Sequence, residues 1–477
     1  MSERDDIANA PREAASMSLA AEPDRDVMDS EDRLRSDFVS EVLDAVEAGD
    51  NATARSLVAP LHPADVADLI ELARADEREG LVAALAELVD ADVLAELNDY
   101  VRDELLDEME PQRVADLAGQ LDTDDAVALI EDLDDDDQRA VLRAMEPDDR
   151  AAIEEALSYP EESAGRLMQR DLIAVPEHWR VGQVIDYLRS DAELADDFWE
   201  VFVVSPAHHP IGTCKLSTIL RSDRDVAVRD VMIDEQTLIP VDLDQEEVAL
   251  RFQKYALISA AVVDNSGRLV GMVTVDDVVH IIQEEAGEDA LLLSGAGEGD
   301  INQPVHLAVR TRLTWLVINL ATAMLAASVV GMFRGEIGRF ALLAVLMPIV
   351  SGMGGNAGTQ TLAVTVRALA TNQLTSSNTA RMIGREMRIA TMNGLALGLL
   401  VGGGTWLVFG NQTLGLVIAA SMLINNLVAG LAGILVPVTL DRAHIDPAVS
   451  STVFVTTATD VMGFFSFLGL ASLAGLG

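Results

Sequence analysis

The residue of this sequence best placed for chemistry is Asp460, a single acid inside the apolar run STVFVTTATDVMGFFSFLGL. That run contains no Lys, Arg or His. A charged side chain at the centre of a membrane helix costs about 2.5–3.5 kcal/mol or more, so such residues usually line a pathway or a cavity. Two interpretations follow. Asp460 contacts a transported ion, or a protonated or paired Asp460 forms a hydrogen bond to another helix.

The residues before Asp460 extend this polar character along one predicted helix. Thr456, Thr457 and Asp460 have the spacing that places side chains on one helix face. Asp446 precedes Pro447, which is typical of a helix start, and it lies fourteen residues or about 21 Å before Asp460. Acids and hydroxyls without His or Cys favour a hard cation such as magnesium over zinc or copper.

A second polar motif interrupts another apolar run, MPIVSGMGGNAGTQTLAVTVRALAT. Its proline and glycines predict a loosened helix backbone, which is tolerated at membrane depth where it is buried in protein or lines a wet cavity. Asn356 and Gln360 would then offer amide groups at the break. Close helix packing by small residues is the alternative explanation of the glycines. The motif comprises Pro348, Gly352, Gly354, Gly355, Gly358, Asn356 and Gln360.

Charge divides the 477 residues into two halves. Residues 310–477 contain nine Arg and five acids, so they carry +4, whereas the net charge of −46 leaves −50 on residues 1–309. An acidic surface of this kind suits a protein that stays hydrated in high salt, and the acids could also collect cations. The absence of a basic face disfavours nucleic acid as a partner.

The acidic half contains two kinds of repeat. Segments such as HPADVADLIELA and DTDDAVALIEDL predict short helices that stack into an all-α superhelical N domain. Farther on, residues 172–188 resemble 238–254 and residues 201–220 resemble 260–279, with strand, helix, strand, turn, strand and helix in each copy. This is the pattern of a pair of α/β CBS domains.

The basic half contains five apolar stretches long enough to cross a bilayer. Seven flanking arginines fall on one side and two on the other, which places the N-terminal domains in the cytoplasm and the C-terminus outside. An acidic helix connects the two halves. The expected domains are a disordered tail at 1–36, the N domain at 37–160, tandem CBS domains at 161–282, the connecting helix at 283–310 and a five-helix transmembrane domain at 311–477. The expected spans are about 311–333, 340–370, 387–409, 413–440 and 447–475.

This order of parts, with the motif from Pro348 to Gln360 and the stretch from Asp446 to Asp460, resembles the MgtE family of magnesium channels and transporters. The resemblance covers about residues 37–477 and implies a homodimer in the plasma membrane with a pore on the two-fold axis. It also implies that Asp460 of both chains forms the central magnesium site. Thr456, Thr457 and Asn356 would accompany it, and Asp446 would lie at the cytoplasmic mouth.

The resemblance further implies gating by cytosolic magnesium, which would bind between the soluble domains and the connecting plug helix. Positions that commonly carry acids in the family read Ala128, Ala256 and His280 here, so fewer or weaker sensor sites are expected. Each remaining acid could equally be a solvated surface residue. The implied regulatory ligands are Asp92, Asp124, Glu246, Asp277, Glu285, Glu288 and Asp289.

Several functions remain open at this stage. Thr274 and Asp277 resemble the nucleotide-binding signature of CBS domains, so ATP is a candidate ligand, although a plain strand-to-helix turn explains them equally well. A transporter of cobalt or manganese is the main alternative function. An intramembrane zinc enzyme lacks its histidines, and a chloride channel would place its CBS domains after the spans. We therefore expect a magnesium transport protein and no enzyme.

Overall fold

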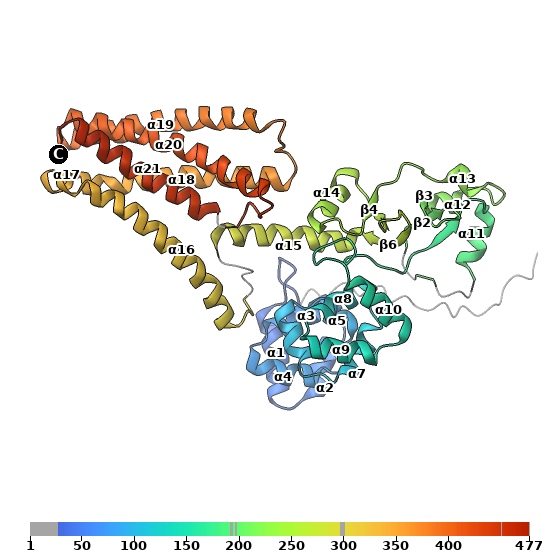
Figure 1. Cartoon of the computed structure of the whole chain (residues 1–477). Coiled ribbons are helices and arrows are strands. Elements are labelled where there is room, and N and C mark those ends of the chain that lie inside the picture. The colour runs from blue at the N-terminus through green and yellow to red at the C-terminus, as the bar shows by residue number, and fades with distance from the viewer. Residues whose placement is uncertain (1–26, 191–193, 196–197, 296–300, 450, 477) are drawn as a thin grey trace, which may run out of the picture. The chain divides into compact units, whose positions relative to one another are not determined.

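The structure is a computed structural model that describes residues 27–190, 194–195, 198–295, 301–449 and 451–476. The chain forms two compact units. The first contains the residues up to 245 and residues 258–274, and the second contains residues 246–257 and all residues from 275 onward. Figure 1 labels the helices and strands of both.

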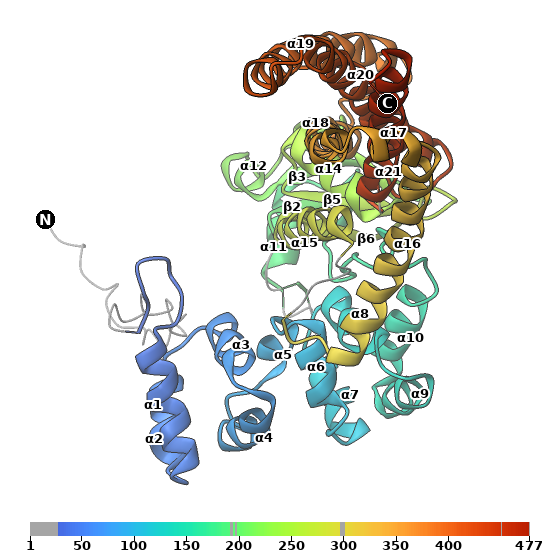
Figure 2. The ribbon, with the colours of Figure 1, turned by 90° about the vertical axis from the view of Figure 1, so that its left-hand side faces the viewer.

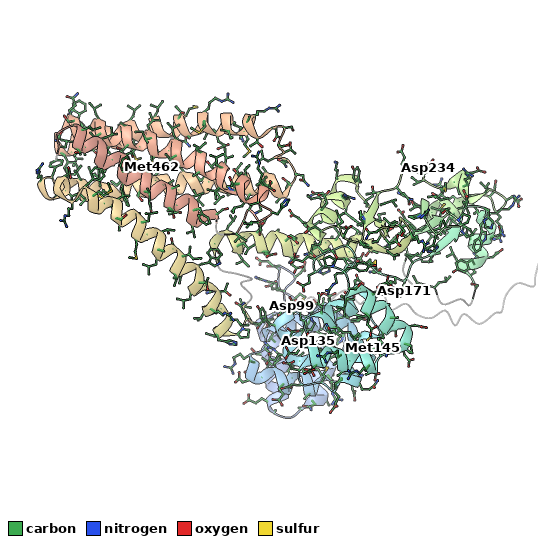
Figure 3. All side chains as sticks on the ribbon, in the orientation of Figure 1. Asp99, Asp135, Met145, Asp171, Asp234 and Met462 are labelled. Carbon is green, nitrogen blue, oxygen red and sulfur yellow. The ribbon has the colours of Figure 1, made fainter. Side chains whose placement is uncertain are left out.

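The N-terminal part of the first unit consists of ten short helices, as the repeated apolar spacing predicts. Local chemistry starts them: the Asp50 side chain accepts a hydrogen bond from the Thr53 backbone at 3.2 Å, and Pro63, Pro111 and Pro147 stand at helix starts. Their apolar faces form one core, while acids such as Asp99 and Asp135 are exposed (Figure 3). The helices are α1 (Ser36–Glu47), α2 (Asn51–Val58), α3 (Pro63–Leu72), α4 (Ala75–Ala84), α5 (Ala91–Ala95), α6 (Asp99–Leu106), α7 (Pro111–Ala118), α8 (Thr123–Glu131), α9 (Asp135–Ala144) and α10 (Pro147–Ala156).

The same unit contains two three-stranded sheets with identical topology, which confirms the internal repeat. In each sheet the first strand pairs parallel with the second, and the second pairs antiparallel with the third. Phe202, Ala261 and Met272 belong to one apolar cluster that joins the two sheets. The elements are β1 (Ala174–Pro176), α11 (Val181–Leu188), β2 (Glu200–Val204), β3 (Pro210–Lys215), α12 (Leu216–Arg221), α13 (Val228–Val231), β4 (Leu238–Pro240), β5 (Ser259–Val263) and β6 (Leu269–Thr274).

The second unit contains five helices that are long and apolar enough to cross a membrane, judged by length and composition. Helix α20 contacts α18, α19 and α21, while α18 also contacts α21 (Figures 1 and 2). The helices of this unit are α14 (Gln245–Tyr255, of which Gln245 belongs to the first unit), α15 (Val275–Ser294), α16 (Val305–Met332), α17 (Arg334–Arg339), α18 (Leu342–Ala370), α19 (Thr379–Phe409), α20 (Gln412–Arg442) and α21 (Ser451–Leu473).

Small residues set the distance between α19 and α20. A Cβ atom on Gly402 would lie 2.6 Å from the Gly415 carbonyl oxygen, and one on Gly398 would lie 2.8 Å from the Ala419 carbonyl oxygen. Any side chain at either glycine would therefore force the helices apart. Such small-residue contacts are the usual basis of helix packing within a bilayer, where lipid tails are as apolar as the side chains.

Three local expectations were wrong. Helix α18 continues through Pro348 and its glycines without a break. The connecting helix α15 begins at Val275 and ends at Ser294, whereas the sequence suggested 283–310, and residues 296–300 lie outside the described part. Helix α21 begins at Ser451, after Asp446 and Pro447 rather than at them. The continuity of α18 and the ends of α15 and α21 could not be predicted from local sequence patterns alone.

Candidate functional site

The contact between α18 and α21 positions Asp460. The hydroxyl of Ser351 on α18 donates a hydrogen bond to Oδ1 of Asp460 on α21, and both residues are half-buried. Among the described residues no partner is recorded for Oδ2. The hydrogen bond fixes the orientation of the carboxylate within the membrane domain and leaves its second oxygen available to an ion.

Two glycines of the α18 motif allow this close contact. A Cβ atom on Gly358 would lie 2.5 Å from Val455 Cγ1 of α21, and one on Gly354 would lie 2.0 Å from Asn425 Nδ2 of α20. The packing explanation of the glycines therefore holds at these two positions. In contrast, no neighbour lies within 4 Å of a Cβ atom on Gly352.

Asn425 holds the three helices together and was missed by the sequence reasoning. Its side chain is fully buried, and Nδ2 donates a 2.9 Å hydrogen bond to the Val350 carbonyl of α18. A Cβ atom on Gly463 of α21 would lie 2.8 Å from the same Nδ2. Asn425 thus fits between a glycine of α18 and a glycine of α21, and the carbonyl it binds belongs to Val350, the neighbour of the Ser351 that contacts Asp460. The pair of asparagines, Asn425 and Asn426, in an apolar run was the signal that could have revealed it.

The other predicted pore residues are distributed along the same helices. Thr456 lies one turn before Asp460 on α21, and the Thr457 hydroxyl donates to the Val453 carbonyl of its own helix at 2.6 Å. Gly355 approaches Thr459 of α21, its added Cβ lying 4.0 Å from the hydroxyl oxygen. Asn356 and Gln360 lie one turn apart on α18 and are exposed in the single chain. None of the recorded hydrogen bonds joins Asn356 to Asp460.

At the N-terminal end of α21 the structure brings α15, the expected plug helix, against the candidate mouth. The Thr452 hydroxyl donates to the Leu293 carbonyl at 2.7 Å. Leu292 and Leu293 pack against a cluster formed by Leu362, Val366, Ala448 and Val455. The end of α15 is therefore seated on α18 and on the N-terminal part of α21, the helix that carries Asp460.

Two predicted metal ligands meet at this contact. Burial raises the pKa of Asp289 on α15, and the negative charge of Asp446 raises it further. Asp446 itself is exposed, and its carboxylate accepts a 2.7 Å hydrogen bond from the Ala448 backbone. A cation between Asp289 and Asp446 would remove their repulsion and strengthen the contact of α15 with this end of the helix bundle.

The remaining regulatory candidates lie in both units. Asp92 is exposed on α5, whereas Asp124 is 9% exposed on α8. Glu246 belongs to α14 and Asp277 to the first turn of α15, while Glu285, Glu288 and Asp289 have the spacing of one α15 face. The described residues contain no group of three or more His, Cys, Asp or Glu side chains that could hold a metal. Thr274 ends β6, and Asp277 follows in the next helix.

The combination of five membrane helices with soluble N-terminal domains defines a multi-pass membrane transport protein. Three family models match the chain: the MgtE intracellular N domain over residues 61–162, the CBS domain over 228–284, and MgtE, described as a divalent cation transporter, over 347–470. The CBS match covers the second copy, whose sequence signal is the clearer one.

Relatives agree with these matches. The magnesium transporter MgtE of Thermus thermophilus is 35% identical over 325 residues, which cover 67% of this chain and 72% of that protein. The Bacillus subtilis transporter of the same name is 30% identical over 66% of this chain and 70% of its own. The chain therefore belongs to the MgtE family. A solved cytosolic domain of the Mg2+ channel MgtE in complex with ATP is 29% identical, covers 51% of this chain and 99% of its own, and has a TM-score of 0.46.

Proposed function

We propose that the chain is a magnesium channel or transporter of the cell membrane, with its N-terminal domains in the cytoplasm and its C-terminus outside. The observation that carries the proposal is the position of Asp460, an acid in an apolar helix whose carboxylate is oriented by Ser351 of the neighbouring helix. The relatives named above are magnesium transporters, which supports magnesium as the cargo. We keep the order of the five domains expected from the sequence, with α15 (Val275–Ser294) as the plug helix in place of residues 283–310.

The chemistry of magnesium fits a single acid per chain. Mg2+ releases its waters reluctantly and keeps several of them when it binds proteins. A site for a hydrated ion needs a few oriented oxygen acceptors, which Asp460, Thr456, Thr457 and Asn356 would supply. A homodimer with a pore on its two-fold axis would place two copies of Asp460 around one ion.

Gating follows from the seated plug helix. Cytosolic magnesium would bind the acids of the N domain, the CBS pair and α15, with Asp289 and Asp446 closing the mouth. Without the ion, repulsion between these acids would favour release of the plug helix. ATP is a candidate ligand of the second CBS copy through Thr274 and Asp277, and the ATP complex of a relative supports its inclusion in binding assays.

Magnesium flux into liposomes tests the pore assignment. Asp460→Ala should abolish flux in protein that remains folded, while Asp460→Asn should impair it less, because the amide keeps an oxygen acceptor and loses the charge. Asp441→Asn is the matched control, since it removes an exposed acid at the cytoplasmic end of α20. Wild-type flux in the Asp460→Ala protein would rule out Asp460 as the central site.

A transporter of another divalent cation is the second candidate, because the matching family model is described by the broader cargo class. Competition in the same liposomes separates the two. Cobalt or manganese at equal concentration should reduce magnesium flux little if the site selects the hydrated magnesium ion. Faster uptake of cobalt or manganese than of magnesium would favour the second candidate.

A further inference from the structure

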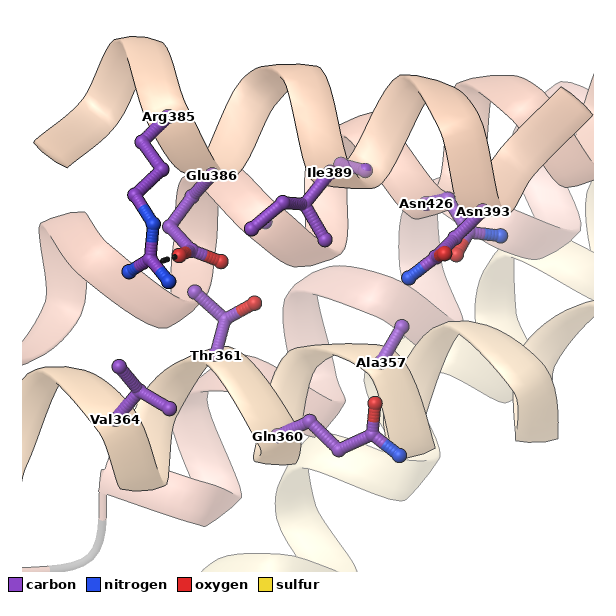
Figure 4. Close-up of a pocket in the computed structure, with 11 residues that line it drawn as sticks. Ala357, Gln360, Thr361, Val364, Arg385, Glu386, Ile389, Asn393 and Asn426 are labelled. Atoms are coloured by element: carbon purple, nitrogen blue, oxygen red, sulfur yellow. Dashed lines mark hydrogen bonds and ion pairs between the residues drawn. The ribbon is translucent and has the colours of Figure 1, made fainter.

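A polar cavity lies between α18, α19 and α20, away from the contact of Ser351 with Asp460. Its volume is ≈ 200 Å³, and its polar lining includes Gln360, Glu386, Asn393 and Asn426 (Figure 4). At about 30 Å³ per water molecule this is room for roughly six waters. A hydrated ion therefore fits the cavity by volume.

Glu386 is the acidic group of this cavity, and Arg385 is its basic group. Glu386 is 5% exposed, although it belongs to an apolar helix. Its polar contact is an ion pair with Arg385 Nη1 at 3.5 Å, longer than the about 2.7–2.9 Å of a strong charge-assisted hydrogen bond, and the Arg385 side chain is 62% exposed. Glu386 lies just before the expected span at 387–409, and a buried charge is normally paired or bound to a cation. The arginine contact leaves most of the carboxylate's bonding capacity unused.

Asn426 supplies a second, independent indication of a ligand. Its side chain is 1% exposed, and Nδ2 donates to the Met422 carbonyl of its own helix at 2.9 Å. Its Oδ1 is buried and has no hydrogen-bond partner among the described residues. A buried acceptor without a partner destabilises the fold, and a water molecule of a hydrated ion in the cavity would supply the missing donor.

The spacing of the polar residues along α19 favours a hydrated cation over a bare one. Glu386 and Asn393 are seven residues apart on one helix face, or about 10 Å at 1.5 Å per residue. Figure 4 shows Ile389 between them, with the Arg385 contact at the Glu386 end. A bare cation binds oxygens at about 2.0–2.6 Å and could not contact both ends. A cation that keeps its water shell could reach both through its waters.

We propose that this cavity, named here the Glu386 cavity, binds a hydrated divalent cation such as Mg2+ through water-mediated contacts with Glu386, Asn426, Asn393 and Gln360. The cavity is separate from the Asp460 site: Ala357, its lining residue on α18 nearest to Ser351, is six residues from it, about 9 Å along the helix axis. The inference uses the cargo named under the proposed function but does not require Asp460 to bind it.

Protection of a cysteine in the cavity tests the proposal in the full chain. Val364 lines the cavity and is 46% exposed, so Val364→Cys in a Cys214→Ser background gives one reactive thiol there. Magnesium at ten times its dissociation constant should slow alkylation by a neutral reagent about elevenfold, because only the empty fraction reacts. Cobalt hexaammine, which mimics hydrated magnesium and cannot exchange its ligands, should protect as well. Met392→Cys, exposed on α19 outside the cavity, should react at an unchanged rate.

Second-site variants separate this site from the pore. Glu386→Gln should abolish the protection, and Asn426→Ala should weaken it, which keeps the test available if one variant fails to fold. Asp460→Asn should leave the protection intact, even though it impairs flux. Protection that survives Glu386→Gln, disappears in Asp460→Asn, or is absent with cobalt hexaammine overturns the proposal. Wild-type flux in the Asp460→Ala protein would contradict the proposed pore site but would not contradict the proposal for the Glu386 cavity.

Discussion

The contact of α15, the proposed plug helix, with the membrane helices gives a quantitative prediction for Leu293. Leu293→Ala removes three carbons from a half-buried side chain that packs against Leu362, Val366 and Val455, while the backbone hydrogen bond from Thr452 remains. Three buried carbons contribute about 2.4 kcal/mol at about 0.8 kcal/mol each, and half burial leaves about 1.2 kcal/mol. The closed state should therefore lose about eightfold in population per chain relative to the open state.

Open probability against cytosolic magnesium, recorded in planar bilayers, measures this change. The variant should need more magnesium to close than the wild type. Leu291→Ala is the matched control, because it removes the same atoms from the same helix, and Leu291 is not among the residues packed on this cluster. An unchanged closing curve for Leu293→Ala, or an equal shift for Leu291→Ala, would refute the assignment of α15 as the plug.

Three further predictions concern sensing, stability and topology. The double substitution Ala256→Asp with His280→Asp should lower the magnesium concentration at which the pore closes. Ala256 has a φ of 51°, a conformation that Asp and Asn tolerate better than Ala. Ala256→Asn with His280→Asn therefore controls for relief of backbone strain without adding charge. Burial raises the pKa of Asp103 to about 6, and Asp132 adds to the shift, so the ionised carboxylate destabilises the folded state above pH 6. Asp103→Asn should then raise the free energy of opening of α6, measured by hydrogen exchange at pH 7.5, by about 1 kcal/mol after allowance for partial exposure of the side chain. This gain in stability should vanish near pH 4. In a Cys214→Ser background, Gln412→Cys should be labelled from outside and Ser376→Cys from the cytoplasm; the reverse pattern would contradict the five-span orientation.

The sequence predicted those parts of the fold that local patterns determine. Apolar spacing in the N domain, the repeated strand and helix order of the CBS pair and the lengths of the five apolar runs each reflect burial within one element or its nearest neighbours. Helix ends were less predictable. The stretch of Asp446 and Pro447 has the composition of a helix start, but Asp446 instead accepts a hydrogen bond from Ala448, and the helix begins at Ser451.

The site was predictable only in part, because its contacts join distant segments. Asp460 was evident from its isolation in an apolar run, yet the donor that orients it is 109 residues away on α18. Asn425 lies between two glycines, and Oδ1 of Asn426 is buried. Neither feature could be predicted from the sequence, because both depend on helices that meet only in the folded chain. The acids of the soluble half are so numerous that composition alone does not separate ligands from solvated side chains.

The two interpretations of Asp460 that the sequence left open are compatible in this geometry. Ser351 donates to one carboxylate oxygen, which is the helix-to-helix hydrogen bond of the second interpretation. A carboxylate has two oxygens, so Oδ1 can accept from Ser351 while Oδ2 contacts an ion. The hydrogen bond and the proposed ion contact therefore do not exclude each other. Ser351→Ala should accordingly weaken flux less than Asp460→Ala, since it removes the orientation of the charge and keeps the charge itself.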